Sequence, residues 1–269
     1  MPVADMRQLL LTIAITATGR ICVVRDRLLG RVPWDGCMEA AGPGTSRHSI
    51  RSGRQVLDAV LVEPQSAPAW ASVLICHGIG ETVALWHGVQ QMLAANGVAS
   101  LVFDYAGYGR SSGFFTARQA EEDAVAAFHC LERLTAPLPV SVLGLSLGSG
   151  IAAAILGRVP AHRLALLGAF TSLRKAALSV GIPRMFESAV PPIWDTEAAL
   201  RRCAVPVLIL HGEEDRLFPV RMAGELAAFC SSKCRLVIVP GLGHNEPFYQ
   251  PKSSYWGSIV ARFLLDSSD

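Results

Sequence analysis

A serine between two glycines is the first feature of this sequence that indicates chemistry. The stretch Gly144-Leu145-Ser146-Leu147-Gly148 follows a short apolar run and precedes a helical pattern that begins at Ile151. A sharp strand-to-helix turn leaves no room for side chains two residues either side of its centre. It lifts the central hydroxyl clear of the backbone, near the positive end of the next helix. We therefore predict that Ser146 is a nucleophile; the alternative is a glycine-rich turn with an incidental serine.

A serine hydroxyl is a poor nucleophile near neutral pH unless a base lies within hydrogen-bond reach. Seven histidines compete for this role, and His244 alone lies late in the chain, in a glycine-rich loop directly after a strand pattern. Such a loop suits an exposed, mobile imidazole. We interpret His129, inside a helical pattern, and His162, in a loop before a strand, as structural or solvent-facing. His244 is therefore the predicted general base.

An acid is needed to orient that base, and three carboxylates follow the apolar run at residues 207–210: Glu213, Glu214 and Asp215. Asp215 lies furthest beyond the end of the strand and precedes Leu217-Phe218-Pro219, so it can turn toward a crevice. We interpret Glu213 and Glu214 as solvent-facing or loop-stabilising. Asp215 is therefore the predicted orienting acid.

Acyl transfer also needs hydrogen-bond donors aimed at the developing oxyanion. We predict one donor in the backbone N–H of Leu147, the residue after the nucleophile. The second is predicted in the loop His77-Gly78-Ile79-Gly80-Glu81, whose glycines let the backbone approach a substrate closely. The N–H of Ile79 is our first choice and that of Gly80 the alternative. His77 is expected to hold this loop by hydrogen bonds and to take no part in the chemistry.

The elements that must position these residues alternate between strands and helices. Two alternating segments separated by Ser52-Gly53 predict a hairpin. Short apolar runs then predict buried parallel strands, at residues 73–76, 100–103, 140–145, 164–169, 207–210 and 236–239. Thr116 and Gln119 resemble a capping box, and the apolar residues after them recur at helical spacing, which predicts a helix between two of the strands. The same spacing over residues 256–264 predicts a helix after the last strand. The fold class is α/β, with one mostly parallel, doubly wound sheet and a leading antiparallel hairpin. Each predicted site residue follows a strand, at the edge of such a sheet where chemistry is found.

Charge and cysteine content argue against some classes of partner and ligand. The net charge of +2 is small and dispersed, with no basic stripe, and argues against nucleic acid as a partner. The seven cysteines lack framework spacing and are read as mostly free thiols. Cys230 and Cys234 have the spacing of a metal pair but no second pair near them, so two cysteines on one helix face are favoured. We expect no metal ion and no cofactor.

The first 45 residues are predicted to be an extension, ending in a linker rich in glycine and proline, before a domain at residues 46–269. An apolar run at residues 9–17 is too short to span a membrane. We favour a helix that packs on the domain or lies on a membrane surface over a signal-peptide core. A cytoplasmic location is expected; the alternatives are membrane association or export through this segment. Oligomeric state is left open.

A segment at about residues 170–204 is predicted to form a short lid. It is too short for a large cap domain but apolar enough to line an acyl pocket. The residues predicted to bind substrate are Phe170, Met185, Phe186 and Trp194 of the lid, together with Trp86. This indicates a small-molecule carboxylic ester or thioester with an apolar acyl group as substrate.

These motifs together resemble the α/β-hydrolase superfamily, over roughly residues 48–265. The resemblance is carried by His77-Gly78, the stretch DYAGYGRSSG from Asp104 to Gly113, the turn at Ser146, HGEED from His211 to Asp215, and Gly243-His244. The DYAGYGRSSG stretch and the compact region before His211 resemble those of the Bem46-like and ABHD13/ABHD17-type serine hydrolases. Some of those hydrolases act on acyl thioesters and esters, including depalmitoylation.

The resemblance implies an α/β-hydrolase fold, catalytic roles for Ser146, Asp215 and His244 in that chain order, and oxyanion roles for Ile79 and Leu147. The first 45 residues lie outside it and lack the cysteine cluster that begins the palmitoylated relatives. A serine at the turn argues against dehalogenase or epoxide hydrolase chemistry, which uses aspartate there. Acyl transfer, peptidase-like amide hydrolysis and a non-catalytic binding module remain as alternatives.

Overall fold

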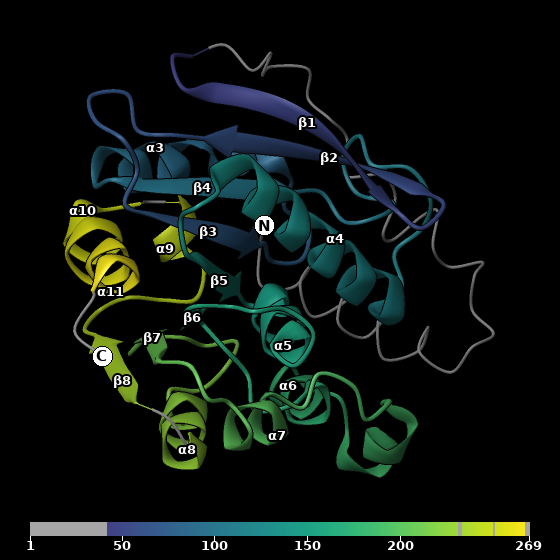
Figure 1. Cartoon of the computed structure of the whole chain (residues 1–269). Helices are drawn as coiled ribbons and strands as arrows, with labels where there is room; N and C mark the ends of the chain where they lie inside the picture. The colour runs from purple at the N-terminus through teal and green to yellow at the C-terminus, as the bar shows by residue number, and fades with distance from the viewer. Residues whose placement is uncertain (1–41, 231–232, 250, 267–269) are drawn as a thin grey trace.

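An antiparallel hairpin opens the described part of the chain and forms one edge of the central sheet (Figure 1). The computed structural model describes residues 42–230, 233–249 and 251–266. Strands β1 (Thr45–Ser52) and β2 (Gln55–Val62) make the hairpin, and β2 also pairs antiparallel with β4. The other strand pairs are all parallel, and the sheet order is β1-β2-β4-β3-β5-β6-β7-β8. The predicted α/β class, hairpin and mostly parallel sheet are confirmed.

The parallel strands match the short apolar runs of the sequence. They are β3 (Ala71–Cys76), β4 (Val98–Phe103), β5 (Val140–Leu145), β6 (Leu164–Leu167), β7 (Val207–Gly212) and β8 (Cys234–Val239). Every residue of β3 to β7 is buried, because helices cover both faces of the sheet. The edge strand β8 is only partly covered and leaves Leu236 and Ile238 exposed.

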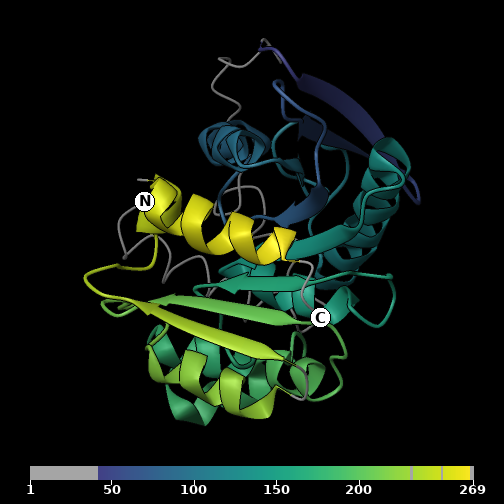
Figure 2. The same ribbon diagram turned by 60° about the vertical axis from the view of Figure 1, so that its left-hand side comes forward.

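Two layers of helices pack on the sheet. On one face lie α3 (His87–Ala95) and the C-terminal helical segment, which Figure 2 shows in yellow across the strands. That segment runs through α10 (Ser253–Tyr255), the π-helical η3 (Trp256–Ala261) and α11 (Arg262–Leu265). The other face is covered by α4 (Ala117–Thr135), α5 (Leu147–Ile155) and α8 (Arg221–Phe229). Each layer buries its own apolar cluster against the sheet.

Helix α4 shows how the sequence pattern sets a boundary. The Thr116 side chain accepts a hydrogen bond from the Gln119 N–H at 3.0 Å, which satisfies a donor that has no partner within the helix. Most residues at helical spacing after it are buried, among them Ala120, Ala124 and Phe128, but Leu134 near the end of the helix is 41% exposed. The predicted start of the helix and its buried face up to Leu131 are therefore confirmed.

The segment between β6 and β7 contains three short helices: α6 (Leu173–Ser179), the 3-10 helix η2 (Arg184–Ala189) and α7 (Thr196–Arg201). It is the segment predicted as a lid. Elsewhere, a 3-10 turn, η1 (Val83–Trp86), leads into α3, and α9 (Glu246–Tyr249) precedes the C-terminal segment. None of the helices in the described ranges is both long and apolar enough to cross a membrane.

Two further predictions concern the N-terminal extension and the pair Cys230 and Cys234. Residues 1–41, with the predicted N-terminal helix, Cys22 and Cys37, lie outside the described residues, so the extension stays a prediction. The interpretation of Cys230 and Cys234 as two cysteines on one helix face is wrong. Helix α8 ends at Phe229 and Cys234 is the first residue of β8, so the two thiols belong to different elements.

Candidate active site

Three side chains from three separate loops form a continuous hydrogen-bonded chain. The Ser146 Oγ lies 2.8 Å from His244 Nε2, and His244 Nδ1 lies 2.6 Å from Asp215 Oδ2. A carboxylate only accepts hydrogen bonds, so Nδ1 carries the imidazole proton and Nε2 is left to accept from the serine hydroxyl. All three side chains are largely buried. This is the geometry in which an imidazole can remove the proton from a serine.

Asp215 is held as a carboxylate by its neighbours. Burial opposes its ionisation, but hydrogen bonds from His211 and His244 outweigh burial and hold the pKa of Asp215 well below its usual range. Its second oxygen accepts from the N–H groups of Leu217 and Phe218, at 2.9 and 2.8 Å. These contacts fix the carboxylate in position and charge. Glu213 and Glu214 are exposed, as predicted.

The space around the His244 ring is defined by neighbouring residues. The ring of Phe218 packs against it edge-on, with centroids 5.0 Å apart. On another side, a Cβ at Gly168 would lie 3.2 Å from His244 Cε1, and Gly168 has a φ of +52°. Any larger residue at this position would be strained and would crowd the ring. The end of β6 therefore contributes space for the imidazole.

Ser146 occupies a strained turn between β5 and α5. Its φ of +52° is unusual for a residue with a side chain, and such strain is found at functional sites. A Cβ at Gly144 would lie 2.3 Å from the carbonyl oxygen of Gly148. A Cβ at Gly148 would lie 1.9 Å from that of Cys76, at the end of β3. The two glycines therefore let the turn close and let it pack on the neighbouring strand.

Replacing Gly148 with alanine should destabilise the protein strongly, because the new methyl group meets backbone atoms that cannot rotate away. We expect a loss of about 3 kcal/mol or more in the free energy of unfolding, the upper end for overpacked sites. Urea denaturation followed by circular dichroism measures it.

The matched control is Gly224→Ala in the exposed part of α8, where an added Cβ has nothing within 4 Å. There alanine should raise the free energy of unfolding by about 0.5–1 kcal/mol through its better helix propensity. Equal stability of the two variants would contradict the tight packing described for the turn.

The loop after β3 lies directly against this turn. Besides the Cys76 carbonyl, the His77 carbonyl oxygen would be 2.7 Å from a Cβ at Gly148. Ile79, the predicted second oxyanion donor, belongs to this loop and is buried. Leu147 is the first residue of α5, so its N–H precedes the hydrogen-bond ladder of the helix. The two predicted donors thus come from adjoining segments.

Glu81 holds the same loop from beneath. One carboxylate oxygen accepts from the Gly78 N–H at 2.8 Å and from Trp86 Nε1 at 2.9 Å. A Cβ at Gly78 would lie 2.6 Å from the other oxygen, so only glycine leaves room for the carboxylate there. Burial raises the pKa of Glu81 to about 7, while these two hydrogen bonds act in the opposite direction. The first turn after β3 is therefore tied to η1.

His77 and Asp104 complete the support of this loop. His77 Nδ1 lies 2.8 Å from the Gly78 carbonyl oxygen, and its ring packs against those of Tyr105 and Tyr108. Burial lowers the pKa of His77 to about 4, so the ring is neutral at pH 7 and Nδ1 donates to the carbonyl. Asp104 accepts from the Val83 N–H at 2.9 Å, and burial raises its pKa to about 7.

The predicted substrate-binding residues separate into three groups. Phe170 and Trp194 are buried, and the Phe170 ring packs on Phe218 with centroids 5.4 Å apart. Trp86 is a correction: its side chain is fully buried, packs against Trp256 and donates to Glu81, so it presents no surface to a ligand.

Met185 and Phe186 are also corrections, because they project into solvent from η2 and do not line a buried pocket. The physical reason is that η2 is a short turn at the surface, in which no residue is buried.

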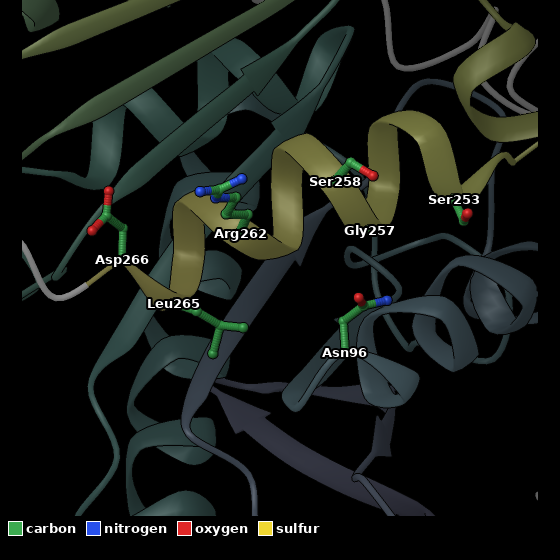
Figure 3. A pocket seen from close by; sticks show the side chains of 7 residues that line it. All are labelled: Asn96, Ser253, Gly257, Ser258, Arg262, Leu265 and Asp266. Carbon is green, nitrogen blue, oxygen red and sulfur yellow. The ribbon is translucent and has the colours of Figure 1, made fainter.

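A separate depression lies between α3 and the C-terminal helical segment (Figure 3). Its lining combines Asn96 at the end of α3 with residues of the helical segment and the residue after it: Ser253, Gly257, Ser258, Arg262, Leu265 and Asp266. No member of the Ser146–His244–Asp215 chain contributes to it. It is therefore distinct from the candidate active site.

Comparison with known proteins identifies relatives of this chain. Residues 67–193 match the family described as Serine aminopeptidase, S33. An uncharacterized protein of Mycobacterium tuberculosis (Rv2307c) is 30% identical over 227 residues, covering 77% of this chain and 78% of the relative. This chain belongs to the α/β-hydrolase superfamily of serine hydrolases.

Other relatives of this α/β-hydrolase include lipases. The lysophosphatidylserine lipase ABHD12 of Danio rerio is 27% identical over 249 residues, covering 81% of this chain and 65% of the relative. A solved structure of an esterase from Pyrococcus furiosus superposes with a TM-score of 0.66 at 19% identity, over 82% of this chain and 90% of the esterase. That likeness is one of fold. The superfamily and the similarity to the lipase support ester hydrolase activity.

Sequence reasoning overlooked two residues of this α/β-hydrolase. One is His211, whose Nε2 lies 2.8 Å from the Phe218 carbonyl oxygen and 3.2 Å from Asp215 Oδ2. Its N–H therefore points to two acceptors, one of which is the carboxylate of the orienting acid. Glu81 is the other. The signal for His211 was its position at the end of β7, four residues before Asp215. Glu81 had no comparable signal, because its partner Trp86 lies on a separate turn.

Proposed function

We propose that this α/β-hydrolase cleaves carboxylic esters or thioesters that carry an apolar acyl group, through a Ser-His-Asp triad. The observation that carries the proposal is the hydrogen-bonded chain from Ser146 through His244 to Asp215, with the serine lifted on a strained turn. The chain order and geometry are those of serine hydrolases with this fold.

In the proposed reaction, the Ser146 hydroxyl attacks the acyl carbonyl while His244 Nε2 takes its proton. The N–H groups of Leu147 and Ile79 stabilise the oxyanion of the tetrahedral intermediate. His244 then returns the proton to the leaving alcohol or thiol, and an acyl-enzyme remains on Ser146. A water molecule, deprotonated by the same imidazole, releases the acid. Ionised Asp215 stabilises the imidazolium in both steps.

Aromatic side chains beside the base support an apolar acyl group. Phe218 packs on the His244 ring and Phe170 packs on Phe218. Beyond Phe170, the Trp194 side chain contacts Phe115, with ring centroids 6.5 Å apart. The lipase named among the relatives acts on a lysophospholipid, which also carries an acyl chain in ester linkage. Phe170, Phe218 and Trp194 are themselves buried, so they support an apolar acyl group by making the surroundings of the base apolar, not by offering exposed surface.

A panel of p-nitrophenyl esters of increasing acyl length tests the proposal, run beside matched acyl thioesters and aminoacyl p-nitroanilides. We expect kcat/KM to rise by up to about fourfold for each buried methylene until the pocket is filled. The full-length protein is used, and a parallel preparation of Ser146→Ala gives the background of contaminating esterases.

Each contrary outcome has a clear meaning. A panel with no preference beyond acetate would overturn the apolar acyl group while leaving ester hydrolysis intact. Faster turnover of the anilides than of the esters would identify a peptidase, in line with the name of the matched family. Turnover only when an acceptor alcohol is added would identify an acyltransferase.

A further inference from the structure

The short 3-10 helix η2 of the predicted lid lies at the surface beside α6. In Figure 1 the stretch between α6 and α7 extends away from the sheet. The flanking residues Ile182 and Val190 are buried and hold its two ends, and the Arg174 side chain donates to the Val190 carbonyl at 2.8 Å. Between these anchors, no residue of η2 is buried. Met185 and Phe186 are 80% and 53% exposed.

This element belongs to the edge of the sheet that carries Ser146. Helix α6 follows the carboxyl end of β6, and after η2 the chain returns to the same edge. There Trp194 Nε1 donates to Glu121 in the first turns of α4, at 3.1 Å. Arg221 begins α8 shortly after the Asp215 loop, again at this edge. The exposed apolar pair therefore stands on the side of the molecule from which a substrate reaches the triad.

Arg184 directly precedes the pair and Glu187 directly follows it, so charges of both signs lie beside the two apolar side chains. A pocket of about 280 Å³ is lined by Lys175, Arg184, Arg221 and Glu225, with Leu178, Ser179 and Met222 as its other walls. Lys175 is shared between Glu197 and Glu225, each at 3.5 Å. Within the described residues, Arg184 and Arg221 form no ion pair. Glu225 lines the same pocket without pairing with either arginine. We call Arg184, Arg221, Met185 and Phe186 the lid surface.

We propose that the lid surface docks on an anionic phospholipid surface, with Met185 and Phe186 entering the acyl boundary and Arg184 and Arg221 facing the phosphate groups. An exposed apolar group rimmed by cations is the pattern of interfacial membrane contact. Basic residues near an anionic leaflet add to the attraction, and salt screens it. Docking would present the catalytic edge to membrane-borne esters.

A lipid surface fits this patch better than a protein does. A stable protein interface buries about 800 Å² on each partner. Two side chains on one helical turn supply much less than that. A lipid leaflet deforms around a small projection and supplies negative charge throughout its area, so a small patch is sufficient.

Co-sedimentation of the full-length Ser146→Ala protein with vesicles tests the proposal without hydrolysis of the lipid, so the result does not depend on the proposed function. The vesicles are phosphatidylcholine with or without phosphatidylglycerol. We expect binding to the phosphatidylglycerol vesicles that weakens as salt is raised. Met185→Ser with Phe186→Ser, and separately Arg184→Gln with Arg221→Gln, should each lower the apparent affinity by roughly tenfold or more.

The matched controls lie at the far end of α4, away from the catalytic edge. Leu134→Ser removes a side chain that is 41% exposed, and Arg133→Gln removes an exposed cation. Neither should change vesicle binding, and the thermal unfolding midpoint of every variant should match the parent.

Several results would overturn the proposal. These are equal binding to neutral vesicles, binding that persists in both lid variants and so resides in another part of the chain, and dimerisation through the lid surface in sedimentation analysis. Absence of binding to either vesicle would overturn it as well.

Discussion

Replacing Ser146 with alanine should lower kcat for ester hydrolysis by roughly 10⁶-fold, the size of effect found when the nucleophile of such a triad is removed. Alanine leaves His244 and Asp215 in place but removes the only group that can form the acyl-enzyme in the proposed mechanism. Labelling by a fluorophosphonate probe should be lost at the same time. Initial rates on a p-nitrophenyl ester and in-gel fluorescence measure the two effects.

Ser141→Ala is the matched control for this substitution. Ser141 lies in β5, the strand that leads into the turn at Ser146, and its buried hydroxyl has no hydrogen-bond partner in the described structure. Losing an unpaired buried hydroxyl costs little stability, so activity and labelling should stay near wild type. Activity of Ser146→Ala within tenfold of wild type, or an unlabelled wild-type protein, would contradict the proposed nucleophile.

Replacing Asp215 with asparagine should reduce kcat by roughly 10⁴-fold, although the side chain keeps its shape. An amide nitrogen in place of Oδ2 would donate to His244 Nδ1, which would then have to lose its proton. The proton would move to Nε2, where it faces the Ser146 hydroxyl, and the imidazole would no longer act as a base. Steady-state kinetics on the same ester measure the loss.

The two neighbouring carboxylates provide controls that test whether Asp215 itself is the orienting acid. Glu213 and Glu214 are exposed, so Glu213→Gln and Glu214→Gln should each leave kcat within about twofold of wild type, as expected for surface substitutions without a partner. A larger loss in either of these variants than in Asp215→Asn would identify a different orienting acid. Unchanged activity in Asp215→Asn would show that the hydrogen bond at 2.6 Å does not set the imidazole tautomer.

The loop after β3, which carries the proposed oxyanion donor Ile79, is connected to the core of the protein. Glu81 joins the Gly78 backbone to the Trp86 ring, and Trp86 packs edge-on against Trp256 of the C-terminal segment, with centroids 6.1 Å apart. A residue predicted to contact substrate thus holds the backbone that is proposed to stabilise the transition state. Preorganised donors of this kind depend on such support, because a loop free to move would lose much of its effect.

The sequence alone determined the features that depend on local spacing. Glycines two positions either side of Ser146, between a strand run and a helical run, determine the turn because backbone sterics act over a few residues. The apolar runs indicated the parallel strands, because buried strands must exclude polar side chains. The hairpin was indicated by two alternating segments separated by Ser52-Gly53. His244 was selected among seven histidines by its loop after a strand, since the carboxyl ends of parallel strands meet at one edge. The choice of Asp215 over Glu213 and Glu214 rested partly on the family resemblance.

Only the tertiary structure decided where side chains point in irregular segments. Trp86, Met185 and Phe186 are large apolar residues in short turns, where no periodicity tells an inward face from an outward one. Contacts with remote elements settle their direction: Trp256 and Glu81 enclose Trp86, whereas the anchors of η2 leave Met185 and Phe186 in solvent. The residues that support the site were hidden for the same reason, because a hydrogen bond across a fold leaves no spacing in the chain.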